Sequence, residues 1–354
     1  MQSATRVSSA GTPGLAAARI AGLDSLRGLA ALAVVMYHYT DAYNHVLGQH
    51  LALWFDFKRG NLGVDAFFVI SGFVIFMTLD KSTSAADFVV SRFSRLFPAY
   101  WSCLIWTYVG VGLSGLPRFH YPLVDFAANF TMVQQALGFS HIDGVYWTLQ
   151  LELVFYGVML MAWQLGALKR SRLLILIGLL VNTCALLIAR REPALADLVF
   201  SDVSFVRFIP LFAIGMVMYR AHRDGSLGRD DVVILILCVV ARFSANLLWA
   251  GVLASAMCVA LILLSRARLA LDQKVLVWLG GISYPLYLIH QHLGYAVIFH
   301  LVEWGVDPNL AVLMAIALAL WAGWAIARHV ERPLQARIRT AWARRQQGLP
   351  RTAP

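Results

Sequence analysis

Residues 27–38 of the chain read RGLAALAVVMYH and open its first long apolar segment. Arg27 begins this stretch and His38 ends it. At about 100° and 1.5 Å per helical residue, the two side chains share one helix face and lie roughly 16 Å apart along the axis. The apolar residues between them predict a membrane helix, so we expect His38 about halfway across a ~30 Å hydrocarbon core. An ionisable group at that depth indicates a functional site; the alternative is a histidine bonded between helices for packing alone.

The composition predicts a polytopic helical membrane protein. Of the 354 residues, 60% are hydrophobic and 14% are charged, with a mean hydropathy of +0.68. Repeated apolar runs of about 20 residues suit transmembrane helices and are too long for the strands of an outer-membrane barrel. The four cysteines lie inside apolar runs without metal-ligand spacing, so no metal site is predicted.

We predict one all-α bundle of ten transmembrane helices, at residues 28–45, 62–79, 96–115, 145–166, 171–189, 203–221, 231–247, 248–265, 281–302 and 309–328. The run 231–265 is the least clear. A single helix there would be roughly 50 Å long, too long for a bilayer even when tilted. Two short helices with a turn near Trp249 are therefore predicted.

The basic residues predict the orientation. Placing the N-terminus in the cytoplasm puts most of the 29 lysines and arginines on inner segments, as the positive-inside rule requires. This placement explains the net charge of +10 without a nucleic-acid partner. We expect a multi-pass protein of the bacterial cytoplasmic (inner) membrane with both termini cytoplasmic. It would comprise a short segment 1–20, a membrane domain 21–333 and a basic tail 334–354. The positive-inside rule and contact with anionic lipids explain the basic residues of this tail equally well.

Two carboxylates enter the predicted spans. Asp65 lies near the outer end of its span, where an interfacial position is the alternative, and the Ser71–Gly72 pair further along permits close helix approach. Glu152 lies roughly 8 Å below Trp147 and has no cation nearby in sequence. It therefore needs a partner from another helix, and a histidine is the obvious candidate; a purely structural buried pair is the alternative.

Paired arginines precede the third predicted span. Arg92 and Arg95 are one helical turn apart, just before Pro98, on the predicted cytoplasmic side. Two guanidinium groups at that spacing suit a polyphosphate, and ordinary positive-inside flanking is the alternative. Arg207 lies shallowly inside span 203–221, where we expect it to pair with an acid or another acceptor.

The span 281–302 is unusually polar. Tyr284, Tyr287 and Gln291 share a face, which indicates that this helix lines a cavity and does not face lipid, and His290 lies at a depth similar to that of His38. Near the end of the last span, Glu331 is interpreted as an ordinary inside-facing helix-end residue. The residue pattern thus predicts a lined cavity with a basic mouth, but it does not separate an enzyme from a transporter.

Seven segments of the chain closely resemble the acyltransferase-3 family of integral membrane acyltransferases, over most of residues 22–333. They are GLDSLRGLAALAVVMYH, NLGVDAFFVISGFVI, RFSRLFPAYW, YWTLQLELVFY, RFIPLFAIG, LGGISYPLYLIH and VERP. One departure is that the fourth-span motif usually carries a serine near Leu149, where this chain has Thr148. The short C-terminal tail resembles the stand-alone members, which lack an extracytoplasmic esterase-like domain.

The resemblance implies transfer of an acyl group, commonly acetyl, from cytoplasmic acyl-CoA to a hydroxyl of a glycan or lipid-linked sugar. It implies that Arg27, Arg92 and Arg95 bind the CoA phosphates. His38 would be the general base, and Glu152 would orient its imidazole. The remaining candidates, for acceptor binding or support, are Asp65, Ser71, Tyr156, Arg207, Tyr284 and His290.

Two other classes stay open at this point. A proton-coupled transporter also places His and Glu at mid-membrane depth, although this chain has no internal repeat. A non-catalytic scaffold has no need of buried ionisable groups. The acceptor, the acyl length and the oligomeric state do not follow from the sequence.

Overall fold

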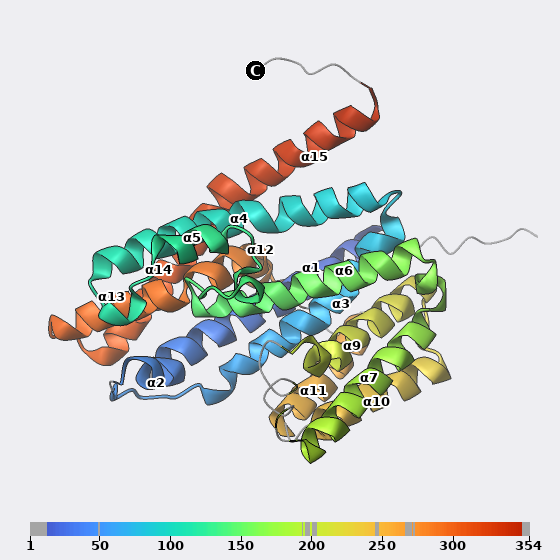
Figure 1. The fold of residues 1–354 in the computed structure, drawn as a ribbon, viewed down its shortest axis with the longest axis horizontal. Coiled ribbons are helices and arrows are strands. Elements are labelled where there is room, and N and C mark those ends of the chain that lie inside the picture. The colour runs from blue at the N-terminus through green and yellow to red at the C-terminus, as the bar shows by residue number, and fades with distance from the viewer. Residues whose placement is uncertain are drawn as a thin grey trace, which may run out of the picture.

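The computed structural model describes residues 13–48, 50–192, 194, 199, 204–244, 248–265, 271 and 273–348. These residues form helices and connecting turns and no strand. Most of the long helices lie side by side along a common direction (Figure 1). The predicted all-α class is confirmed for this part of the chain.

The helices follow the predicted spans closely in position. In chain order they are α1 (Pro13–Tyr37), α2 (Tyr43–Leu47), α3 (Gly63–Lys81), α4 (Ala85–Ser114), α5 (Leu123–Asn129), α6 (Trp147–Gln164), α7 (Ser171–Arg191), α9 (Phe205–Asp224), α10 (Arg229–Ser244), α11 (Leu248–Ser265), α12 (Lys274–Ile289), α13 (Gln291–Glu303), α14 (Pro308–Ile326) and α15 (Arg332–Gln346). Two π-helical turns interrupt the α-helical hydrogen-bond pattern: His38–Ala42 after α1 and Ala327–Glu331 between α14 and α15. Such turns are frequent at functional sites.

Five helical stretches are long and apolar enough to cross a membrane: Lys58–Lys81, Ala85–Ser114, Gly144–Gln164, Ala167–Arg191 and Pro308–Gln346. Their outward faces expose large apolar side chains, for example Leu113, Leu180 and Trp321. Such faces suit a lipid environment, and the molecule is a multi-pass membrane protein. The count of ten spans and the cytoplasmic side of both termini stay predictions.

Two predicted boundaries behave differently in the structure. The run 231–265 forms two helices, α10 and α11, which pack against one another as predicted. The predicted span 281–302 is covered by two consecutive helices, α12 and α13, which meet at His290. The hydroxyl of Tyr39 donates to the His290 carbonyl oxygen at 2.7 Å. The same oxygen also accepts from the Gly294 backbone N–H at 2.9 Å, so helical hydrogen bonding continues past this residue.

The centre of the bundle depends on close helix crossings. α1 packs most extensively on α12, and α3 packs on α9. A Cβ on Gly280 would lie 2.0 Å from the Asp24 carbonyl oxygen, and one on Gly72 would lie 2.1 Å from that of Phe212. Only glycine permits such backbone approach, so the close approach expected at Gly72 is confirmed.

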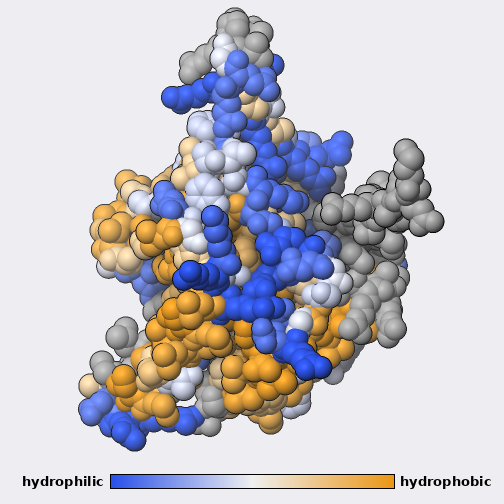
Figure 2. Space-filling model, turned by 90° about the vertical axis from the view of Figure 1, so that its right-hand side faces the viewer, coloured by the Kyte–Doolittle hydropathy of each residue, from blue (hydrophilic) through white to orange (hydrophobic). Residues whose placement is uncertain are grey.

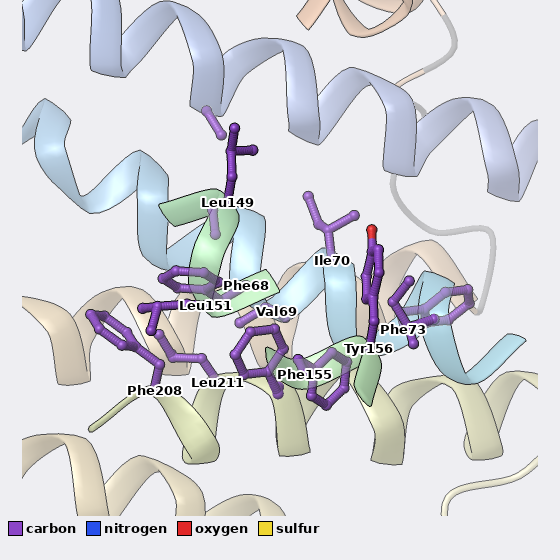
Figure 3. Packing of buried hydrophobic residues seen from close by; sticks show 14 of the residues in the cluster. Phe68, Val69, Ile70, Phe73, Leu149, Leu151, Phe155, Tyr156, Phe208 and Leu211 are labelled. Atoms are coloured by element: carbon purple, nitrogen blue, oxygen red, sulfur yellow. The ribbon is translucent and has the colours of Figure 1, made fainter. Parts of the chain in front are cut away.

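Aromatic side chains fill the space where α3, α6 and α9 meet. Phe68, Phe155 and Phe208 point toward one another there (Figure 3). The rings of Phe68 and Phe208 lie 4.7 Å apart between centroids. Phe155 stacks on Phe212 at 4.0 Å. This apolar wall fixes α3 and α6 relative to each other, and both helices contribute residues to the cavity described next.

Candidate active site

A narrow cavity of about 90 Å³ lies between α1, α3, α4, α6 and α12. Its polar lining brings together residues that are far apart in sequence: Arg27, Ser71, Arg92, Arg95, Thr148, Glu152, Tyr156, Tyr284 and Tyr287. Seven of the eleven predicted site residues are among them. The other four are His38, Asp65, Arg207 and His290, and they do not line this cavity.

Glu152 is bound by neutral donors. Its Oε1 accepts hydrogen bonds from the Ser71 hydroxyl at 3.2 Å and from the Tyr156 hydroxyl at 2.7 Å. Glu152 has no ion pair within the described ranges. We expected Glu152 to orient His38, but the structure gives the two residues different hydrogen-bond partners. The physical reason is that α3, and not α1, packs its small polar residue against this face of α6.

The arginines at the cavity have unequal partners. Arg95 forms an ion pair with Glu331 and lies over the Tyr284 ring, 5.5 Å from its centroid. Glu331 is 1% exposed, so our interpretation of it as an ordinary helix-end residue is wrong. The π-helical turn Ala327–Glu331 brings its carboxylate inward onto α4. Arg27 has a weaker partner, with Nη1 3.8 Å from an oxygen of Asp24.

His38 pairs with His290. Nδ1 of His38 lies 2.9 Å from the Val34 carbonyl oxygen and 2.9 Å from Nε2 of His290. Nδ1 of His290 in turn lies 2.9 Å from the Tyr287 carbonyl oxygen. A carbonyl only accepts, so each Nδ1 carries a proton, and Nε2 of His290 accepts from His38. In the neutral His38 ring the unprotonated nitrogen is therefore Nε2, which is the nitrogen that a general base needs free.

Tyr287 connects the histidine pair to the cavity. Its side chain lines the cavity, and its ring centroid lies 5.9 Å from that of His290. The Tyr287 hydroxyl lies 3.0 Å from the Thr148 hydroxyl, which also donates to the Val145 carbonyl oxygen. The arginines thus line the cavity itself, whereas the histidine pair lies outside the lining, next to Tyr287.

The sequence analysis missed Asp143 and His292. Asp143 is fully buried; its Oδ1 accepts from the Val145 backbone N–H at 3.2 Å and its Oδ2 from that of His292 at 3.1 Å. Asp143 thereby ties the start of the helical turn before α6 to α13. An aspartate directly before the run GVYW has the pattern of a helix N-cap, and that signal would have found it.

Asp65 and Arg207 belong to a different region. Asp65 forms a buried ion pair with Arg242 at 2.5 Å, and Nη1 of Arg242 donates to the Arg207 carbonyl oxygen at 3.0 Å. The Arg242 side chain is only 2% exposed. The Arg207 guanidinium lies over the Phe208 ring. These contacts join α3, α9 and α10, and Asp65 does not line the cavity.

No group of three or more His, Cys, Asp or Glu side chains suited to a metal ion is present within the described ranges. The cavity instead offers guanidinium groups, hydroxyls and one carboxylate. This donor set suits a phosphate-bearing organic ligand, because arginine forks match phosphate oxygens.

The family model described as an acyltransferase domain matches residues 20–328, most of the chain. The chain belongs to the acyltransferase-3 family. The resemblance carried by the seven segments is therefore confirmed, and these segments contribute every predicted site residue.

Individual members of the acyltransferase-3 family are similar over parts of their length. The chain is 33% identical to the exopolysaccharide production protein ExoZ of Rhizobium meliloti over 46% of this chain and 51% of that protein. It is 32% identical to the O-acetyl transferase of Shigella phage Sf6, over 38% and 43%. It is 32% identical to the peptidoglycan O-acetyltransferase OatA of Listeria monocytogenes, over 24% and 13%. The chain thus spans about half the length of the Rhizobium protein and less of the other two. No solved structure matches it.

Proposed function

We propose that the protein is a membrane O-acyltransferase. It moves an acyl group, acetyl in the first instance, from acyl-CoA to a hydroxyl of a glycan or lipid-linked sugar. Family membership and the O-acetyl transferase names of two relatives support this assignment. The observation that carries the mechanism is a cavity lined by three arginines beside a histidine whose Nε2 is left free as a base.

In this mechanism the arginines hold the donor. Arg27, Arg92 and Arg95 bind the phosphates of acyl-CoA at the cavity mouth, and the thioester arm extends toward Tyr287. The mouth faces the cytoplasm, where acyl-CoA is available, in a ten-span bundle of the bacterial inner membrane with both termini inside. Tyr284 and Tyr156 supply the wall along which the arm lies.

His38 performs the proton transfer. Its Nε2 takes the proton from the acceptor hydroxyl while that oxygen attacks the thioester carbonyl carbon. The C–S bond then breaks, and the thiolate leaving group recovers the proton from the imidazolium. His290 takes the orienting role that the resemblance implied for Glu152, because its Nε2 accepts a hydrogen bond from Nδ1–H of His38. Glu152 supplies a negative charge on the cavity wall, which favours the transient imidazolium.

The test is transfer of label from radiolabelled acetyl-CoA into a membrane glycan fraction, with wild type and His38→Ala at matched expression. General-base catalysis contributes about 10²–10⁴-fold, so label incorporation should fall to near background in the variant. A properly inserted His38→Ala that labels as well as wild type contradicts the assigned base. If neither protein transfers label, the donor or acceptor is wrong and the proton-coupled transporter becomes the leading alternative.

A further inference from the structure

A second hollow lies next to the cavity, and Figure 2 views the molecule from the side of the α3–α4 connection. It encloses about 510 Å³ between the C-terminal end of α3, the N-terminal half of α4 and the tail helix α15. Hydrophilic residues form a band down the middle of this face between apolar flanks (Figure 2). Arg92 lines both the hollow and the cavity, so one extended ligand can occupy the two together.

The hollow carries more positive than negative charge: three cations and one carboxylate, that of Asp87, line it. Three cations line it, Lys81, Arg92 and Arg339, and none of them forms an ion pair in the described part of the chain. Nε of Arg92 is buried and has no hydrogen-bond partner. Arg92 and Arg339 lie close enough for their charges to repel each other. A buried guanidinium N–H without an acceptor is costly, so this arrangement favours a bound anion.

The acid in the hollow does not neutralise these cations. The Asp87 carboxylate accepts hydrogen bonds from Thr83, from Gln346 and, at 2.7 Å, from the indole N–H of Trp342. All three donors are neutral. Asp87 keeps its negative charge but forms no ion pair with these cations in the described part of the chain, and its hydrogen bonds hold the tail helix; the excess positive charge of the three cations is left for an anion.

Helical spacing places Arg339 over the hollow. Arg339, Trp342 and Gln346 are three and seven residues apart, so they share one face of α15. The last two bind Asp87 on α4, which directs that face toward α4 and fixes Arg339 beside Arg92. The docking of α15 thus builds one wall of the hollow.

We propose that Arg92, Arg339 and Lys81 form a binding site for a phosphate group, and that this group belongs to the nucleotide end of the acyl-CoA donor. The inference rests on the proposed function. Arg339 lies beyond residues 20–328, so membership of the family does not assign it. An anionic lipid headgroup shares the phosphate chemistry. The donor is favoured because Arg92 joins this hollow to the cavity that leads to Tyr287.

The experiment measures binding of CoA and of dephospho-CoA to the purified full chain in phosphatidylcholine nanodiscs. Wild type is compared with Arg339→Ala and with Arg337→Ala. Arg337 is an exposed residue of the same helix outside the hollow, so its variant carries the same loss of charge. A second series repeats the CoA measurement with phosphatidylglycerol in the nanodiscs, and also compares the binding of each protein to phosphatidylglycerol vesicles.

Arg339→Ala is expected to weaken CoA binding about tenfold, the loss of one charge-assisted phosphate contact, while Arg337→Ala binds as wild type does. A smaller defect with dephospho-CoA assigns the 3′-phosphate, and an equal defect assigns the pyrophosphate; both support the site. If Arg339→Ala loses only phosphatidylglycerol binding, the phosphate comes from lipid and the donor assignment is overturned.

Equal affinities of Arg339→Ala and Arg337→Ala for both ligands overturn the site itself. Failure of the proposed function looks different, because wild type would then bind no CoA. Trp342→Phe provides a second route to the same question. It removes the N–H donor to Asp87 but keeps an aromatic ring, and it should reproduce part of the Arg339→Ala defect by loosening α15.

Discussion

Two carboxylates inside the bundle, Asp65 and Glu152, have opposite surroundings. Asp65 forms an ion pair with Arg242, a side chain that is 2% exposed, between α3 and α10. Glu152 lines a cavity, and among the described residues its partners are the hydroxyls of Ser71 and Tyr156. A buried carboxylate that is paired with a buried cation, as Asp65 is with Arg242, stabilises the packing of the two helices. A charge with neutral partners beside three arginines is left available to a ligand.

The same contrast separates two parts of the molecule. The α3–α9–α10 region contains the aromatic wall and the Asp65–Arg242 ion pair. The region between α1, α4, α6 and α12 contains the arginines, Glu152 and the histidine pair. The first region is expected to determine stability and the second to determine activity, and the predictions below test that division.

The largest effect is expected from Arg242→Ala. It leaves Asp65 buried without its cation, which costs about 3–5 kcal/mol of unfolding free energy. Thermal melting of the purified protein in detergent measures the loss. The matched control is Arg223→Ala, because Arg223 and Asp80 form a pair that is 43% and 34% exposed and worth at most about 1 kcal/mol. Equal melting temperatures for the two variants would show that the Asp65–Arg242 pair stabilises the protein no more than the exposed pair does.

The next largest effect concerns His290. In His290→Phe the ring remains but the acceptor for Nδ1–H of His38 is lost, so kcat is expected to fall roughly 10–100-fold with little change in the KM for acetyl-CoA. His290→Gln provides an amide oxygen near the position of Nε2 and should restore part of kcat. A phenylalanine variant as active as the glutamine variant would show that His290 only fills space.

Glu152→Gln tests the other side of the comparison. The amide oxygen still accepts from Ser71 and Tyr156, so the unfolding free energy should change by less than about 1 kcal/mol. The transfer rate should nevertheless fall about tenfold, because the negative charge on the cavity wall is gone. Melting and label transfer are measured on the same preparation. A variant that loses stability but keeps its rate would place Glu152 with Asp65.

The smallest effect is expected from Ser71→Ala. It removes a hydrogen bond of 3.2 Å to Glu152 and leaves the Tyr156 bond of 2.7 Å in place. The expected loss is about 0.5–1.5 kcal/mol, with a correspondingly modest change in rate. Tyr156→Phe, which removes the shorter bond, should cost more in both assays. The reverse order would mean that Ser71 is the main partner of the carboxylate.

Sequence reasoning succeeded where the signal came from neighbouring residues of one helix, and it failed where the signal came from a partner on a distant helix. The spacing of Arg92 and Arg95 within one helical turn correctly placed both side chains at one cavity. Tyr284 and Tyr287 of the span 281–302 line the cavity as predicted, but nothing in that span revealed that Tyr39 of another segment bonds the His290 carbonyl oxygen. Asp65 was assigned to the site because nothing in its own span reveals Arg242, which lies 177 residues away.

By itself, the sequence determined that the chain forms apolar helices and which polar residues those helices carry, because helical period and hydropathy are properties of neighbouring residues. It also determined the family. Only the tertiary structure decided the partners: His290 for His38, Glu331 for Arg95, Arg242 for Asp65, and Arg339 beside Arg92. Periodicity specifies which face of a helix a side chain occupies. The helix that covers that face is set by the packing of the whole bundle, including the glycine crossings that allow α1 and α12, and α3 and α9, to approach closely.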